Sequence, residues 1–398
     1  MNPPQACSPP WQPAASAWTR ARVSASVLFL ADGAGFGTWA ALIPTIRQKL
    51  DLSEAWLSGV LLAIVAGALV SMSLVGPLLA RRGSRAPLVW LAPGYAVALA
   101  LLGLAPGKFW LLPTAVLFGA LKGALDVSIN AQAITVERAG TRPIMASFQA
   151  LWSLGGLAAA LIVGAALKLG VLPAAITLGM AALLLVASLV STGGLAGGDA
   201  SSATPVKKKQ GFRLLGGNMA RIGFLAFIAL FAEGVMMDWS AVYARSVAGA
   251  EEWLAPLAYG AFALMMAAGR WMGDGFTARF GGAQTLRAGG GLTLAGLLVV
   301  VLCPWWPVTF AGLALAGLGL ANMVPVLFGA AGRAHEESVG QGVATVSLIG
   351  YFGFLLGPPA IGLLSHFSSL QTAFAAVTLV VLPLVLWGGQ ILRKARRG

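Results

Sequence analysis

The sequence predicts an all-α membrane protein, with twelve transmembrane helices in two pseudo-symmetric six-helix bundles. Three observations predict this fold class: the composition, the spacing of the apolar segments and an internal repeat. Of the 398 residues, 58% are hydrophobic and 10% are charged, and the mean hydropathy is +0.84. Because a soluble domain carries far more charge on its surface, lipid is the expected surrounding of most of this chain.

Apolar segments recur along the chain at the length that a membrane helix needs. About 20 apolar residues cross the hydrocarbon core of a bilayer. Twelve segments of roughly this length are present: 23–46, 56–80, 87–105, 110–136, 143–168, 171–191, 219–245, 255–278, 286–303, 308–332, 339–364 and 370–392. An even number of spans places both termini on the same side of the membrane.

The distribution of Lys and Arg predicts which side this is. Nineteen of the 26 basic residues fall in one set of connecting segments, which includes both termini, and five fall in the opposite set. The remaining two, Lys122 and Arg270, lie inside spans. Since basic residues accumulate in cytoplasmic loops, both termini are expected in the cytoplasm.

The longest polar segment between spans divides the chain into similar halves. The expected organisation is an N-terminal cytoplasmic tail (1–22), a six-helix bundle (23–192), a cytoplasmic linker (193–218), a second six-helix bundle (219–392) and a basic cytoplasmic tail (393–398). Ala31-Asp32-Gly33 followed by Trp39 in the first half matches Ala232-Glu233-Gly234 followed by Trp239 in the second. Repeats of this kind build membrane transporters whose site lies near the midplane.

A resemblance to a known family rests on several short motifs. They are Gly119 to Asn130 continuing into Val136-Glu137-Arg138, Phe231 to Gly234 with Asp238-Trp239, Gly269-Arg270, and Gly357-Pro358-Pro359. In these motifs the chain resembles the major facilitator superfamily over nearly its whole length, and more narrowly the YbjJ-like bacterial permeases, which are distantly related to fucose permeases. The resemblance implies alternating access in a bacterial inner membrane, and we expect a monomer.

The resemblance also indicates candidate gate residues. The superfamily's motif between spans 2 and 3 is matched by Gly76, Arg81, Gly83 and Arg85, but Ala80 stands at the position of its acid, as Ala278 does in the second half. Asp274, four residues after Arg270, could replace this acid, or the two could form a structural pair. The expected gate residues are Arg81, Gly83, Arg85, Arg270, Asp274 and Arg279. Span 5 has Gly155-Gly156 without the proline of many proton antiporters, which disfavours drug antiport.

Charged residues inside the spans indicate a proton-coupling site. An ionised group at the bilayer centre costs about 3 kcal/mol, yet Asp32, Asp126 and Glu233 fall near mid-span, which predicts a shared polar cavity. Lys122, Asp126 and Asn130 recur every four residues and therefore line one helix face. The fucose-permease resemblance implies that Asp126 carries proton coupling. From their positions, we expect Lys122 to assist it and Asp32 to accept a second proton or a substrate hydroxyl. The alternatives are a static Lys122–Asp126 pair and an Asp32 locked by donors of a neighbouring helix.

Other polar and aromatic residues inside spans are candidates for the substrate cavity. Each tryptophan among them could instead fill a helix interface, and Asp238 could cap a helix or pair with Arg245. The predicted cavity residues are Asn130, Gln149, Trp39, Trp152, Glu233, Trp239 and Asn322.

The predicted function is proton-coupled uptake of a sugar-like or other polar metabolite. The alternatives are proton-coupled efflux of a drug or metabolite and, without transport, a membrane sensor or scaffold. The expected partners are a small solute, protons and lipid. Nucleic acid is not expected, because the basic residues are spread over loops. The two cysteines and two histidines show no metal-ligand spacing and no catalytic constellation is present, so we expect neither a cofactor nor an enzyme.

Overall fold

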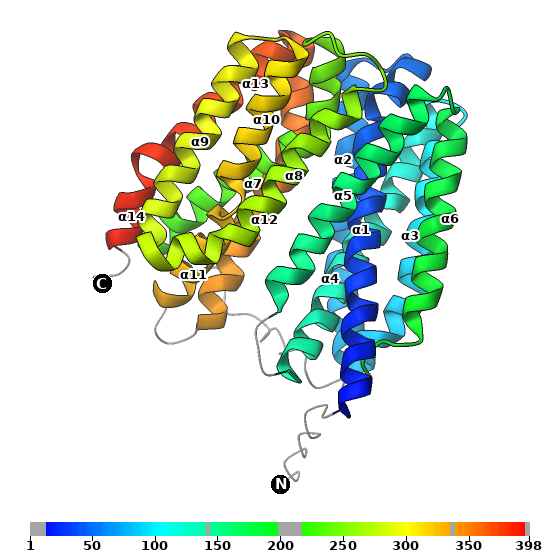
Figure 1. The fold of residues 1–398 in the computed structure, drawn as a ribbon, viewed down its shortest axis with the longest axis vertical. Helices are drawn as coiled ribbons and strands as arrows, with labels where there is room; N and C mark the ends of the chain where they lie inside the picture. The colour runs from blue at the N-terminus through cyan, green and yellow to red at the C-terminus, as the bar shows by residue number, and fades with distance from the viewer. Residues whose placement is uncertain (1–12, 141–143, 198–216, 335–338, 395–398) are drawn as a thin grey trace. The chain divides into compact units, whose positions relative to one another are not determined.

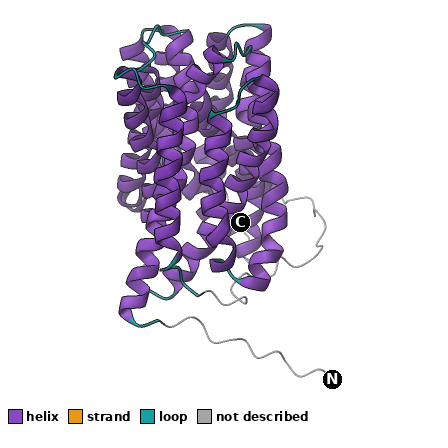
Figure 2. Cartoon of the chain, turned by 90° about the vertical axis from the view of Figure 1, so that its right-hand side faces the viewer, coloured by secondary structure: helices purple, strands orange, loops and turns teal. Residues whose placement is uncertain are grey.

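The computed structural model describes residues 13–140, 144–197, 217–334 and 339–394, and within these ranges every regular element is a helix. Figure 2 shows these helices joined by short loops. The helices of the first half are α1 (Ala15–Lys49), α2 (Glu54–Arg82), α3 (Arg85–Gly103), α4 (Lys108–Arg138), α5 (Met145–Lys168) and α6 (Pro173–Thr192). Each of them contains or overlaps one predicted span.

The second half contains two helix breaks that the hydropathy pattern does not show. Its helices are α7 (Gly217–Ser246), α8 (Ala255–Phe280), α9 (Gly282–Leu302), α10 (Trp306–Leu320), α11 (Met323–Ala334), α12 (Val339–Phe367), α13 (Leu370–Leu386) and α14 (Gly388–Lys394). The predicted span 308–332 is broken at Ala321-Asn322, because Pro325 has no N–H for the preceding turn. The span 370–392 is broken at Trp387, just before Gly388-Gly389.

Eleven of the described segments are long and apolar enough to cross a membrane, with α10 and α11 counted as one and α13 and α14 likewise. The remaining helix, α8, has 26 residues but is more polar. It carries Arg270, Asp274 and Arg279. Three of the six candidate gate residues therefore lie on this helix.

The chain forms two compact units. Unit 1 consists of Met1–Phe36, Ala63–Gly155 and Ala174–Lys209, and unit 2 of Gly37–Leu62, Gly156–Pro173 and Gln210–Gly398. Their boundaries run through α1, α2 and α5, whereas the expected bundles divide the chain at residues 193–218. The domain bounds expected from the sequence therefore stay a prediction.

Glycines bring α1 and α5 into backbone contact within unit 1. A side chain at Gly33 would collide with the backbone of Trp152, and one at Gly155 would collide with the backbone of Leu30. Small residues allow membrane helices to approach this closely. The contact at Gly33 places the neighbouring Asp32 of α1 beside Trp152 of α5.

In unit 2, α7 is buried along most of its length and packs along α12 (Figure 1). Glycines again make the contact: the backbone of Phe227 approaches Gly353, and that of Phe231 approaches Gly357. Side chains at these glycines would separate the two helices, so this packing fixes the register of α7 on α12.

Candidate functional site

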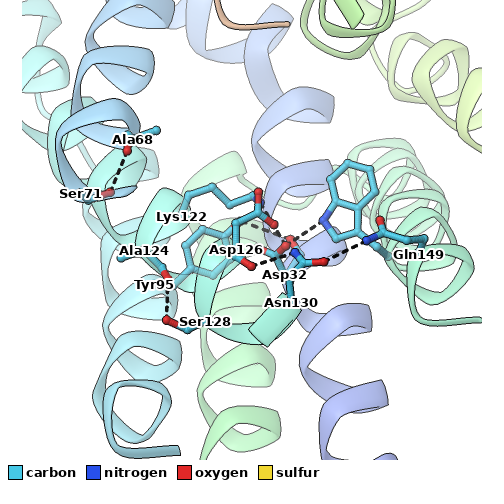
Figure 3. A network of polar contacts seen from close by, with 11 residues as sticks. Asp32, Ala68, Ser71, Tyr95, Lys122, Ala124, Asp126, Ser128, Asn130 and Gln149 are labelled. Atoms are coloured by element: carbon cyan, nitrogen blue, oxygen red, sulfur yellow. Dashed lines mark hydrogen bonds and ion pairs between the residues drawn. The ribbon is translucent and has the colours of Figure 1, made fainter. Parts of the chain in front are cut away.

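The centre of the candidate site is Lys122, which lies between two carboxylates in unit 1 (Figure 3). Its Nζ is 3.1 Å from Oδ2 of Asp32 on α1 and 3.1 Å from Oδ2 of Asp126, one turn further along α4. One ammonium group thus serves two carboxylates, which leaves an excess negative charge when all three groups are ionised. Buried charge of this kind requires a compensating partner or a proton.

Asp32 is enclosed by the protein. Its side chain has 0% exposure, and Oδ2 accepts hydrogen bonds from Lys122 and from the indole Nε1 of Trp152, the latter at 2.8 Å. The hydroxyl of Tyr95 donates to the backbone carbonyl of Asp32 at 3.3 Å. The other carboxylate oxygen, Oδ1, is buried without a hydrogen-bond partner among the described residues. Asp32 is therefore held by donors from α4 and α5, as one sequence alternative expected, but it is only partly satisfied.

Asp126 is the accessible carboxylate of the pair. Its side chain is 31% exposed, against 12% for Lys122. Asn130 lies one turn beyond it and donates from Nδ2 to the Asp126 carbonyl at 2.8 Å. The Asn130 Oδ1 accepts a hydrogen bond from Nε2 of Gln149 on α5 at 3.3 Å. Lys122, Asp126, Asn130 and Gln149 therefore form one polar surface, as Figure 3 shows.

Trp152 belongs to this site through its ring as well as its N–H. The Lys122 Nζ lies 5.8 Å from the ring centroid, within the range of a cation–π interaction. The ring of Phe36 lies 6.2 Å away on the same helix as Asp32. The sequence suggests Trp152 as a stacking platform, whereas the structure also makes it a hydrogen-bond donor to Asp32.

Two predicted cavity tryptophans and one asparagine have structural contacts in unit 2. Trp39 is 2% exposed and Trp239 0%, and the Trp239 indole donates to the carbonyl of Pro358 at 2.9 Å. The burial of both indoles favours the alternative in which they fill helix interfaces. Asn322 lies at the break between α10 and α11 and donates to the carbonyl of Gly269 at 2.6 Å, so it joins this break to α8.

Glu233 forms an ion pair in unit 2. Its Oε1 accepts from Nη2 of Arg270 on α8 at 3.0 Å, and the side chain of Glu233 is 9% exposed. The sequence also suggests Asp274 as a partner of Arg270, and that pairing stays a prediction. The side chain of Asp274 lies outside the described residues. Asp32 and Asp126 both contact Lys122 within unit 1, whereas Glu233 lies in unit 2. A cavity shared by all three acids therefore stays a prediction.

Four of the six candidate gate residues lie at two matching turns. Gly83 between α2 and α3 has φ 69°, and Gly281 between α8 and α9 has φ 82°. This left-handed conformation favours glycine. Arg81, Arg85 and Arg279 are exposed beside these turns. A contact that sequence reasoning missed fastens the first turn: the buried Ser84 hydroxyl donates to Gln132 of α4 at 2.7 Å.

Within the described residues, no group of three or more His, Cys, Asp or Glu side chains could hold a metal ion. The chemistry that the Lys122 site can perform is therefore that of its own groups: binding and releasing protons, and hydrogen bonding to a polar molecule.

Comparison with curated proteins identifies relatives along most of the chain. No family model matches it. An uncharacterized MFS-type transporter of Yersinia pestis is 33% identical over 362 residues, covering 91% of this chain and 93% of the relative. The uncharacterized transporter y4wD of Sinorhizobium fredii and the membrane protein MosC of Rhizobium meliloti are each 32% identical and cover 88% of this chain, and the matches span 93% and 85% of the two relatives.

Solved structures show the same fold at low sequence identity. A bacterial homolog of the human lysosomal transporter Spinster, in an inward-facing and unoccupied conformation, has a TM-score of 0.74 at 14% identity, covering 97% of this chain and 99% of that one. The nucleoside transporter NupG has a TM-score of 0.69 at 13% identity, covering 94% and 99%. These matches confirm the twelve-helix fold class expected from the sequence.

Proposed function

The chain belongs to the major facilitator superfamily, and we propose that this membrane transporter takes up a small polar, sugar-like solute together with protons by alternating access. The observation that supports this proposal is the sharing of Lys122 by an enclosed carboxylate, Asp32, and an accessible one, Asp126, at equal distances. Two carboxylates and one ammonium group carry a net negative charge, which the binding of one proton neutralises.

The difference in exposure between the two acids supports a different role for each. Asp126 is 31% exposed and can receive a proton from water, whereas Asp32 at 0% has no access except through its neighbours. When Asp126 is protonated, Lys122 pairs with Asp32 alone and the site is neutral. When the proton leaves, Lys122 is shared again and the excess charge returns. Because a charge in the membrane interior costs several kcal/mol on most scales, the two forms favour different degrees of hydration.

The polar surface around Asp126 fits a hydroxyl-rich solute. Asn130 and Gln149 present both amide N–H donors and carbonyl acceptors, and Asp126 adds a carboxylate beside them. The apolar groups that an amphipathic drug would contact are buried instead: Met236, Met237 and Trp239 are each at most 2% exposed. This contrast favours a polar solute over a drug.

A binding screen followed by a transport assay tests the proposal. Thermal unfolding of the purified protein with a panel of sugars, sugar acids and polyols identifies a ligand, since binding to the folded state raises its stability. Proteoliposomes then receive that ligand under an imposed pH gradient. Uptake is supported when the solute accumulates on the alkaline side. Movement toward the acidic side would identify proton-coupled efflux, and equilibration without accumulation would refute coupling.

We also propose that the protein lies in the cytoplasmic membrane with both termini and the 193–218 linker in the cytoplasm. The basis is the unequal distribution of basic residues. A reporter that is active only outside the cytoplasm, fused after Lys208 or Arg396, should stay silent, and a fusion at Lys108 should be active. Reporter activity after Lys208 or Arg396 would contradict the proposed orientation.

A further inference from the structure

A proline pair interrupts the hydrogen bonding of α12. Pro358 and Pro359 lie inside the helix Val339–Phe367. Since proline has no N–H, each one removes the helical hydrogen bond to the carbonyl four residues earlier, which frees the carbonyls of Phe354 and Leu355. A carbonyl without a donor is costly inside a membrane protein. A donor from another helix is therefore expected near these positions.

The freed carbonyl of Phe354 is directed at α7. A Cβ built on Gly234 would lie 2.6 Å from its oxygen. The backbone of Phe227 and that of Phe231 also contact α12, and positions 227, 231 and 234 form one face of a helix. Position 238, four residues after Gly234, continues this face. The residue there is Asp238.

Helix geometry directs the side chain of Asp238 toward the turn that faces the freed carbonyl. In an α-helix the Cα–Cβ bond tilts toward the N-terminus, so a side chain covers the preceding turn, which here begins at Gly234. The neighbouring Trp239 also contacts α12, because its indole donates to the Pro358 carbonyl at 2.9 Å. Asp238 is 8% exposed, and its Oδ1 has no hydrogen-bond partner among the described residues.

Glu233, Arg245 and Arg270 of α7 and α8 have described partners other than Asp238. Arg270 of α8 pairs with Glu233, which lies on a different face of α7 from Asp238. Arg245, a candidate partner of Asp238 in the sequence, donates instead to the carbonyl of Ala250 at 3.1 Å. Asp274 and Arg279 fall in the last two turns of α8.

Among the described side chains, none forms an ion pair with Asp238. The helices α10 and α13 contain no charged residue, and His366 of α12 lies about two turns beyond Pro358. The charged side chains of α11 and α14 lie near the ends of those helices and outside the described side chains: Arg333, Arg393 and Lys394. An ionised Asp238 would therefore lack compensation from the described side chains.

We infer that Asp238 is a second proton-binding site, in which the carboxyl group holds its proton against the carbonyl oxygen of Phe354. The carboxylate takes a proton from water, and the resulting O–H donates where Pro358 supplies no N–H. One proton thus satisfies two acceptors and links α7 to α12. A metal ion would require several oxygen ligands, whereas the described residues bring one carboxyl group and one directed carbonyl to this point. The site lies in unit 2 and does not depend on coupling at Asp126.

Infrared spectroscopy of the purified full-length protein at neutral pH tests this inference. The carbonyl stretch of a protonated carboxylic acid should be present in the wild type and lose one component in Asp238→Asn, whose amide can still donate to Phe354. The control Glu252→Gln removes an exposed carboxyl group and should leave that region unchanged. Identical wild-type and Asp238→Asn spectra in that region would overturn the inference.

A second variant keeps the test independent of how Asp238→Asn folds. Pro358→Ala restores an N–H for the Phe354 carbonyl, so the acid loses its acceptor and its carbonyl stretch should move to higher frequency. An unchanged band would contradict the hydrogen bond. Thermal unfolding in sodium chloride and in choline chloride tests whether the site binds a metal cation instead. If sodium stabilises the wild type but not Asp238→Asn, the site binds a metal ion and the inference of a bound proton is wrong.

Discussion

Asp32 and Glu233 occupy matching positions in the internal repeat but have different electrostatic surroundings. Asp32 shares Lys122 with a second acid, Asp126, whereas Glu233 has an ion pair with Arg270. The first arrangement carries an excess negative charge, and the second pair is neutral. The comparison teaches that the same Ala-acid-Gly pattern can place its acid beside a shared cation in one half and in an ion pair with an arginine in the other.

The largest expected effect concerns Asp126, the acid that shares Lys122 with Asp32. Asp126→Asn keeps the shape of the side chain and its hydrogen bonding but removes its titration. We expect the solute identified by the binding screen to bind normally and to reach no accumulation beyond equilibrium under a pH gradient, measured in proteoliposomes. The matched control Glu54→Gln, at the start of α2, should accumulate the solute like the wild type. Accumulation in Asp126→Asn with unchanged pH dependence would make the acid structural.

The second effect concerns stability in unit 2. Glu233→Leu leaves Arg270 in the protein interior without this carboxylate, and breaking a buried pair in this way costs about 3 kcal/mol. The double variant Glu233→Leu with Arg270→Met should recover much of the loss, because both charges are gone. A double-mutant cycle of the free energy of unfolding measures this coupling. Strictly additive losses would show that the pair is not the source of the effect.

The smallest expected effect refines the description of Asp32. Trp152→Phe removes the indole N–H that donates to Oδ2 but keeps an aromatic ring beside Lys122. A single hydrogen bond contributes about 1 kcal/mol, or about 2 kcal/mol when its acceptor is charged. Thermal unfolding should show a loss of this size in the wild-type background and little loss when Asp32 is already Asn. Equal losses in both backgrounds would indicate that the ring, and not the N–H, stabilises the site.

Part of the candidate site could be predicted from local spacing. Lys122, Asp126 and Asn130 lie four residues apart, so the geometry of a helix alone places them on one face. The sequence also predicted that Gln149 and Trp152 line the cavity, but it did not predict which of these residues they contact. The pairing of Lys122 with Asp32, 90 positions away in the sequence, depends on how α1, α4 and α5 are rotated against one another, and no sequence pattern contains that angle.

The fold class was determined by the sequence alone, because hydropathy and the approximate length of a span are properties of consecutive residues. The tertiary structure decided which charges meet. The glycines at Gly33 and Gly155 bring α1 onto α5 so that Trp152 reaches Asp32, and Gly234 brings the carbonyl of Phe354 beside the turn covered by Asp238. Such contacts arise from interlocking surfaces of distant segments, and their geometry exists only once the helices have packed.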